Sequence, residues 1–199
     1  MSRPREFNED RVLDSIMDTF WKSGYEQTSA QDLVEATKLG RGSLYGAYGS
    51  KEKLFKLALT RYKNHSRACA EKLNQKLPVK KCLYDLLHEI ALSEIEVSPK
   101  RGCLVTNTAV EFSGQNSEIN ELVRTNLRIL KQGIYHALLR GQENGEIDSK
   151  LNIIQISLYI LSSIQGLRVM AKISTSEDTA DLLSLIDNIL SVIFKDKNP

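Results

Sequence analysis

The positions of the prolines constrain this chain more than any other feature. Its 199 residues contain four prolines, at positions 4, 78, 99 and 199. The spans 5–77 and 100–198 therefore lack the residue that costs about 3 kcal/mol in a helix interior. Neither span shows a sustained alternation of apolar and polar residues, which is the signal of a half-buried strand. The sequence therefore predicts an all-α protein.

Cap residues and apolar spacing divide the chain into about nine helices with short connections. Asn8 precedes an apolar series at i, i+4 spacing that ends near Gly24, and Ser29 with Asp32 forms a capping-box pattern. A third short helix ends near Tyr48, and the later helices are mostly longer; we expect them over 51–77, 79–97, 103–112, 117–141, 151–172 and 177–194. This organisation predicts a three-helix head over 1–50, a connecting helix over 51–77 and a helical domain over 78–199.

The net charge of +2, from 27 Lys and Arg against 25 Asp and Glu, hides an uneven distribution. Residues 1–37 carry a net charge of −4, residues 38–67 carry +7, and residues 68–199 carry −1. A basic run is commonly only a solvated helix face. Here it begins at the turn between two short helices and continues into the start of the next, where a helix-turn-helix would contact phosphate.

Several other classes of protein are not indicated. Three widely spaced cysteines and three scattered histidines give neither a disulfide framework nor a zinc motif, so no metal or cofactor is expected. Residues 1–11 lack the apolar region of a signal peptide, and polar residues interrupt the longest apolar stretch, 153–164, so no membrane is expected. No catalytic motif is present. We therefore expect a cytoplasmic protein that is not an enzyme and that is associated with the nucleoid when bound to DNA.

The stretch from Thr28 to Phe55 has the layout of a helix-turn-helix. A capped helix is followed by a short turn and a second helix rich in small residues. The start of the second helix is the end that faces base edges in the major groove, and it carries Arg41, Gly42 and Ser43. Gly42, Gly46 and Ala47 keep the surface of that helix low enough for close approach. This layout predicts a DNA-binding site on the second helix.

Several polar residues of this stretch have a predicted contact. Arg41 suits a bidentate contact to guanine or to a pair of phosphates. The Tyr45 hydroxyl can hydrogen-bond to phosphate, and Lys51 adds positive charge to a helix start that already attracts phosphate. Thr28 and Ser29 act either as helix caps alone or as caps that also touch phosphate.

These residues make the sequence similar to the TetR family of bacterial transcriptional repressors. The resemblance covers about the first 60 residues and is carried by Phe20, Gly24-Tyr25, Thr28-Ser29, Asp32-Leu33, Ala36-Thr37, Leu39, Arg41 to Tyr45, Tyr48, Ser50 to Glu52 and Leu54-Phe55. A second, local stretch resembles a subgroup with electrophile- and redox-responsive members: Gly102-Cys103-Leu104, Asn107-Thr108-Ala109 and Glu111.

One tetrad departs from the family pattern. Many relatives carry Tyr-His-His-Phe or a similar sequence where this chain has Tyr45-Gly46-Ala47-Tyr48. Base reading is therefore expected to depend more on Arg41, on Ser43 and on contact of Ala47 with a thymine methyl group. The Tyr48 ring is expected in the core, with its hydroxyl near phosphate.

The last two expected helices are apolar on more than one face. Residues 151–172 and 177–194 carry leucine, isoleucine and valine almost all round, so each must be covered on two sides. A domain of this size has little left to cover them. We therefore expect a two-fold homodimer through these two helices, which would place two heads on a palindromic operator in double-stranded DNA.

The resemblance implies a pocket for a small-molecule effector in the C-terminal domain. The candidate lining residues are His88, Glu94, Cys103, Asn107, Glu111, Tyr135, Tyr159, Gln165 and Arg168. Each of these could instead be structural: Glu111 and Arg168, for example, could pair with each other or face solvent. Cys103 follows two cations at a helix start, which favours a reactive thiolate, but a free cysteine is more often a small buried hydrophobe.

The resulting hypothesis is a repressor released from its operator by a small molecule. Two alternatives stay open: a repressor that senses electrophiles or oxidants through Cys103, and a helical ligand carrier that binds no DNA. The carrier would explain the C-terminal helices but not the basic segment.

Overall fold

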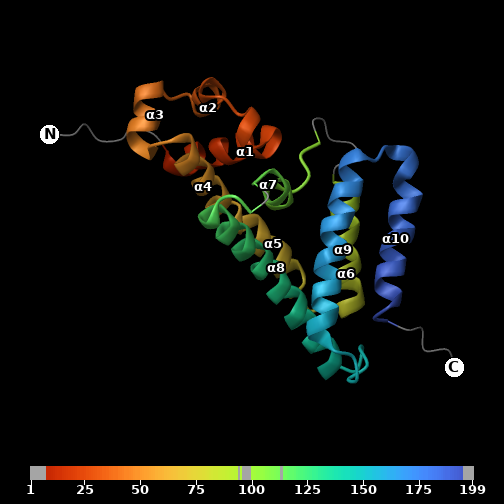
Figure 1. Cartoon of the computed structure of the whole chain (residues 1–199). Coiled ribbons are helices and arrows are strands. Elements are labelled where there is room, and N and C mark those ends of the chain that lie inside the picture. Colours follow the sequence, from red (N-terminus) through yellow and green to blue (C-terminus); the bar gives the residue numbers. More distant parts are fainter. Residues whose placement is uncertain (1–7, 94, 96–99, 113, 195–199) are drawn as a thin grey trace. The chain divides into compact units, whose positions relative to one another are not determined.

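The computed structural model describes residues 8–93, 95, 100–112 and 114–194, and all the regular structure in these ranges is helical (Figure 1). In chain order the elements are α1 (Glu9–Gln27), α2 (Ala30–Thr37), α3 (Arg41–Tyr48), α4 (Lys51–Arg61), α5 (Lys63–Lys72), α6 (Val79–Leu92), α7 (Leu104–Phe112), α8 (Ser117–Glu143), α9 (Ile153–Ile173), the 3₁₀ turn η1 (Ser176–Asp178) and α10 (Thr179–Ser191). The all-α prediction is confirmed.

These helices form two compact units. The first contains the described residues up to Lys63 together with Cys103–Val123, and the second contains the described residues of 64–102 and of 124–194. Helix α7 and the first residues of α8 therefore pack with the N-terminal helices, although they follow α6 in the chain. The predicted division into a head over 1–50 and a domain over 78–199 groups residues by role, whereas these units group them by packing.

An aromatic cluster forms the centre of the first unit. Helix α1 packs against α2, α4 and α7, and the Phe20 and Phe55 side chains are fully buried. The ring centroids of Phe20 and Phe55 lie 4.9 Å apart, and Tyr25 and Phe112 extend the cluster at 5.1 Å and 5.5 Å from Phe55. This apolar centre fixes the four helices that carry and support the helix-turn-helix.

The helix expected over 51–77 is two helices, α4 and α5, which meet at Tyr62. Tyr62 keeps helical dihedral angles, with φ −60° and ψ −17°, and its buried ring packs edge-on against Trp21 at 4.9 Å. Neither glycine nor proline marks this junction in the sequence, so no local signal announces it.

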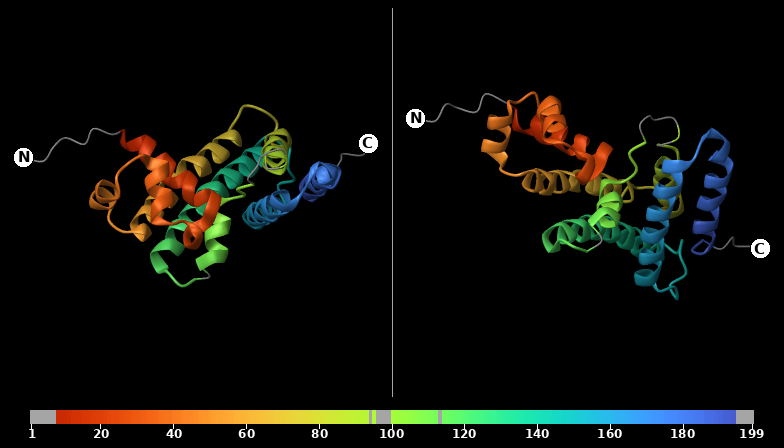
Figure 2. Two further views of the ribbon diagram at one scale, coloured as in Figure 1. Left: turned by 90° about the horizontal axis from the view of Figure 1, so that it is seen from above. Right: turned by 45° about the horizontal axis from the view of Figure 1, so that its top comes forward.

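In the second unit, α6, α9 and α10 lie side by side (Figures 1 and 2). Their buried apolar side chains belong to one core cluster. Helices α5 and α8 approach each other closely where Gly133 meets Ala70. A Cβ atom at position 133 would lie 2.6 Å from the Ala70 Cβ, closer than real side chains tolerate. The absence of a side chain at Gly133 is therefore what permits this crossing.

Helix α9 has two apolar faces. Ile160, Ile164 and Leu167 are fully buried in the core, whereas other large apolar side chains of the same helix are exposed: Ile154, Leu158, Val169, Met170 and Ile173. By length and composition alone this helix could also cross a membrane, a test that core helices pass as well, and a third of its most apolar window is buried. Within the described residues this second apolar face of α9 stays exposed.

Candidate nucleic-acid interface

The helix-turn-helix begins with a double cap at Ser29. The Ser29 hydroxyl accepts from the Asp32 amide at 3.1 Å, and the Asp32 carboxylate accepts from the Ser29 amide at 2.7 Å. The amide of Ser29 holds the pKa of the Asp32 carboxyl below its usual range, so this cap stays ionised. The predicted capping box is thus present, and Ser29 remains exposed beside it.

Thr28 is fully buried, and its hydroxyl donates to the Gly24 carbonyl at 2.6 Å. This hydrogen bond makes Thr28 a cap at the end of α1, and its contact with phosphate stays a prediction.

The second helix of the motif, α3, begins at Arg41 as expected. Its N-cap residue is Gly40, which provides no side-chain cap, so the first amides of α3 are left for an outside partner. Arg41, Gly42 and Ser43 are all exposed, whereas Leu44 is fully buried against the rest of the unit. The start of α3 thus presents a guanidinium, a hydroxyl and backbone N–H groups on one surface.

Gly42 and Gly46 have no packing reason to be glycine within this chain. A Cβ atom built at either position would meet no other atom within 4 Å. The described residues therefore leave open space beside both glycines. A duplex laid against α3 would use that space, because a bare helix surface enters a groove more deeply.

The remaining residues of the tetrad differ in exposure. The side chains of Tyr45 and Ala47 are half-buried, so each keeps part of its surface for contact. The hydroxyl oxygen of Tyr48 is buried. That agrees with the prediction that the Tyr48 ring belongs to the core and does not favour a phosphate contact through its hydroxyl.

Lys51 opens α4 after the Ser50 cap and reaches back to the end of α1. Its Nζ atom lies 4.5 Å from the centroid of the Tyr25 ring and donates to the Glu26 carbonyl at 3.3 Å. Sequence reasoning predicted the cation but missed these partners, because they lie 25 and 26 residues away along the chain. The contacts hold the Lys51 ammonium group at the end of α1.

Two cations of the basic segment are used in ion pairs within the first unit. The Arg61 guanidinium pairs with Asp14 at 2.7 Å and Asp10 at 2.6 Å, which fastens α4 to α1 and raises the pKa of Arg61. Lys56 binds Glu118 and Glu52, each at 2.6 Å, and these carboxylates raise the pKa of Lys56. Exposed cations remain in this segment at Lys38, Arg41, Lys53 and Arg67.

The residues predicted to line an effector pocket are divided between the two units. Cys103, Asn107 and Glu111 belong to the first unit, and His88, Tyr135, Tyr159, Gln165 and Arg168 belong to the second, while Glu94 lies outside the described residues. Tyr159 is on the exposed side of α9, and the Glu111 carboxylate binds backbone amides at the end of α1. The prediction of these residues rests on chain position and polarity, and neither property predicts long-range packing.

Cys103 immediately precedes α7 and is 2% exposed. Its sulfur lies 3.6 Å from the Tyr62 hydroxyl. Burial of this kind limits access of an oxidant or electrophile, so the structure fits the interpretation of Cys103 as a small buried hydrophobe.

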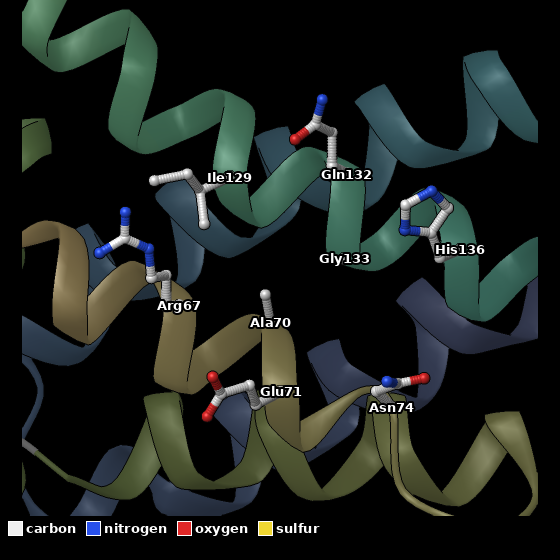
Figure 3. Close-up of a pocket in the computed structure, with 8 residues that line it drawn as sticks. All are labelled: Arg67, Ala70, Glu71, Asn74, Ile129, Gln132, Gly133 and His136. Carbon is white, nitrogen blue, oxygen red and sulfur yellow. The ribbon is translucent and has the colours of Figure 1, made fainter.

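The second unit has a different pocket, between α5 and α8, with a volume of about 300 Å³ (Figure 3). It is lined by side chains of both charges, by amides and by an imidazole: Arg67, Ala70, Glu71, Asn74, Ile129, Gln132, Gly133 and His136. The contact of Gly133 with Ala70 brings the two helices together within this pocket. None of its lining residues was nominated from the sequence.

Together the fold and the α2–α3 geometry define a helix-turn-helix DNA-binding protein with a separate helical unit. Residues 12–58 match the family model for bacterial regulatory proteins of the tetR family, and residues 86–184 match the model for the tetracyclin repressor-like C-terminal domain.

Sequence similarity to known regulators extends over most of the chain. The chain is 30% identical to the HTH-type transcriptional regulator YezE of Bacillus subtilis over 97% of this chain and 100% of that one. It is 29% identical to the HTH-type transcriptional repressor ComR of Escherichia coli over 85% and 82%. A solved structure of a cysteine mutant of the TetR family regulator CifR, complexed with 26-bp operator DNA, superposes with a TM-score of 0.80 at 28% identity, covering 94% of this chain and 98% of that one.

The chain belongs to the TetR family of bacterial transcriptional regulators. Its function is that of a DNA-binding transcriptional regulator, and its relatives are regulators rather than enzymes. The ligand-carrier alternative is not favoured by any of these relatives.

Proposed function

We propose that this protein is a repressor that reads a palindromic operator through α3 and leaves it when a small molecule binds. The observation that carries the proposal is the start of α3, where Arg41, Gly42 and Ser43 are exposed beside an N-terminus without a side-chain cap. Two similar proteins support repression. ComR is a transcriptional repressor, and CifR has been solved in complex with operator DNA.

Each contact at this surface has a chemical basis. Arg41 would bind guanine through its two parallel N–H groups, and Ser43 would bind a base edge or a phosphate. Tyr45, Ser29 and Lys51 would contact the phosphate backbone, which sets the register of the protein on the duplex. Gly42, Gly46 and Ala47 would let α3 enter the groove, with the Ala47 methyl group against a thymine.

The exposed apolar face of α9 and α10 is the proposed dimer interface. Along α9 the stripe runs through Ile154, Leu158, Ser162, Gly166 and Ile173 at spacings of four or seven residues, which keep them on one helix face. Leu185 and Val192 add exposed apolar surface from α10. A two-fold contact through these faces would cover them and would pair two copies of α3.

Release by an effector would follow from binding of a small molecule in the second unit. The pocket between α5 and α8 combines Arg67 and Glu71 with amide side chains, a lining that suits a small polar molecule. Binding there or elsewhere in the second unit would lower operator affinity by the difference in effector affinity between the free and the DNA-bound protein. We place the regulator in the cytoplasm, where its operator lies.

The test is selection of a duplex from a random library by the purified protein, followed by affinity measurements at several salt concentrations. A reader that neutralises several phosphates should lose affinity steeply, with a slope of log K against log salt of about −0.9 for each phosphate contacted. The same measurement with an unselected duplex provides the control. Failure to enrich any sequence, or an affinity that is independent of salt, would overturn the proposal.

A further inference from the structure

Glu111, in the last turn of α7, binds the end of α1 through both carboxylate oxygens. Its Oε2 accepts from the Tyr25 amide at 2.9 Å, and its Oε1 accepts from the Glu26 amide at 2.7 Å. The two residues lie 86 and 85 positions away in the chain. A side chain of α7 thus caps backbone groups of α1.

Gly24 creates the need for this cap. It interrupts α1 with φ 75° and ψ −179°, a conformation that is essentially restricted to glycine. The N–H groups that follow such an interruption lack their usual acceptors one turn earlier. A Cβ atom at position 24 would lie 3.2 Å from the Glu111 Oε2 atom, so the carboxylate sits directly over the interruption.

The segment that Glu111 holds leads directly into the proposed interface. The Thr28 amide donates to the Tyr25 carbonyl at 3.3 Å, and Ser29, the cap of α2, comes next. Lys51 contacts both residues whose amides Glu111 binds, through the Tyr25 ring and the Glu26 carbonyl. The Glu111 carboxylate therefore binds the two residues that Lys51 contacts. One of them, Tyr25, also accepts the hydrogen bond from Thr28 that precedes α2.

Aromatic packing supports the same position. The Tyr25 ring lies 5.2 Å from the ring of Phe112, the residue after Glu111, and 5.1 Å from that of Phe55. Burial raises the pKa of the Tyr25 hydroxyl, which is consistent with a ring enclosed by these neighbours. The end of α1 is thus held by hydrogen bonds on its backbone and by ring contacts on its side chain.

We propose that Glu111 is a positioning residue for DNA binding, which fixes the end of α1, and through it Ser29 and Lys51, without touching DNA. This inference depends on the proposed interface. It also predicts an effect opposite in sign to simple electrostatics. Removal of a negative charge should strengthen binding to a polyanion, whereas loss of a positioning contact should weaken it.

The experiment compares wild type with Glu111→Gln on the duplex that the wild-type protein selects. Glutamine keeps the shape of the side chain but offers one acceptor oxygen, and its NH₂ group faces a second donor. We expect operator affinity to fall by about tenfold, the scale of a lost charge-assisted hydrogen bond. An affinity equal to or tighter than that of wild type would overturn the inference.

The matched control is Glu118→Gln, which removes the same charge from an exposed side chain of the first unit. Glu118 binds the Lys56 side chain and no backbone group of α1. Because exposed ion pairs contribute little, its operator affinity should stay within about twofold of wild type or become tighter. A loss as large as that of Glu111→Gln would overturn the inference, because the effect would then not be specific to the cap.

Amide hydrogen exchange of the unmodified protein decides the matter if Glu111→Gln does not fold. The amides of Tyr25 and Glu26 should be protected although they follow an interruption of the helix. If both amides exchange at the rate of an unfolded chain, Glu111 does not cap them and the inference is wrong. If the wild-type protein selects no duplex, the proposed function fails; if it selects one and Glu111→Gln binds equally well, only the positioning role fails.

Discussion

Replacing Leu158 by glutamate should convert the protein into a monomer. Leu158 is 53% exposed in the single chain and lies in the middle of the apolar stripe of α9, where a partner would bury it. A carboxylate buried without a partner costs several kcal/mol, and in a two-fold interface the change occurs twice. Sedimentation should show twice the chain mass of 22.5 kDa for wild type and the single mass for the variant.

The same variant should bind its operator at least about a hundredfold more weakly, because each head then binds without the gain from a linked second head. The matched control is Val110→Glu, which places the same charge on an exposed apolar residue of α7, outside the stripe. That control should remain dimeric. A wild-type protein that sediments as a monomer at micromolar concentration would contradict the dimer prediction.

Replacing Arg41 by alanine should weaken operator binding by roughly 1–3 kcal/mol and relax base preference at one position of each half-site. Arg41 is exposed at the start of α3, so the thermal midpoint of the free protein should hardly change. The measurement is the affinity for the selected duplex and for duplexes with single base changes.

Arg41→Lys separates charge from geometry. Lysine keeps the positive charge but loses the planar fork that binds guanine through two parallel hydrogen bonds. Its salt dependence should therefore match that of wild type, while its base preference should match that of Arg41→Ala. If Arg41→Ala leaves operator affinity unchanged, α3 is not the helix that reads the DNA.

The fold could be predicted from the sequence where the signals are local. The Asn8, Ser29 and Ser50 caps start the first, second and fourth helices where expected, because a capping side chain binds amides two or three residues away. The junction at Tyr62 could not be predicted in this way. The contact of its ring with Trp21 connects residues 41 positions apart, and no glycine or proline accompanies it.

The residues of the site were likewise predictable only where the signal is local. The exposed start of α3 was predictable, since helix position and residue type define it. The partners of Lys51, the internal ion pairs of Lys56 and Arg61 and the cap formed by Glu111 were not, because each joins segments that only the packed unit brings together. The predicted pocket residues stay a prediction, because their division between the two units does not show which of them share a pocket.

The most direct test of the central claim is hydroxyl-radical footprinting of the wild-type protein on its selected duplex. A two-fold dimer that reads through α3 should protect two inverted half-sites whose centres are separated by about 34–36 Å, roughly 10–10.5 base pairs, or by a multiple of that distance. Protection of a single site without an inverted repeat would contradict the account.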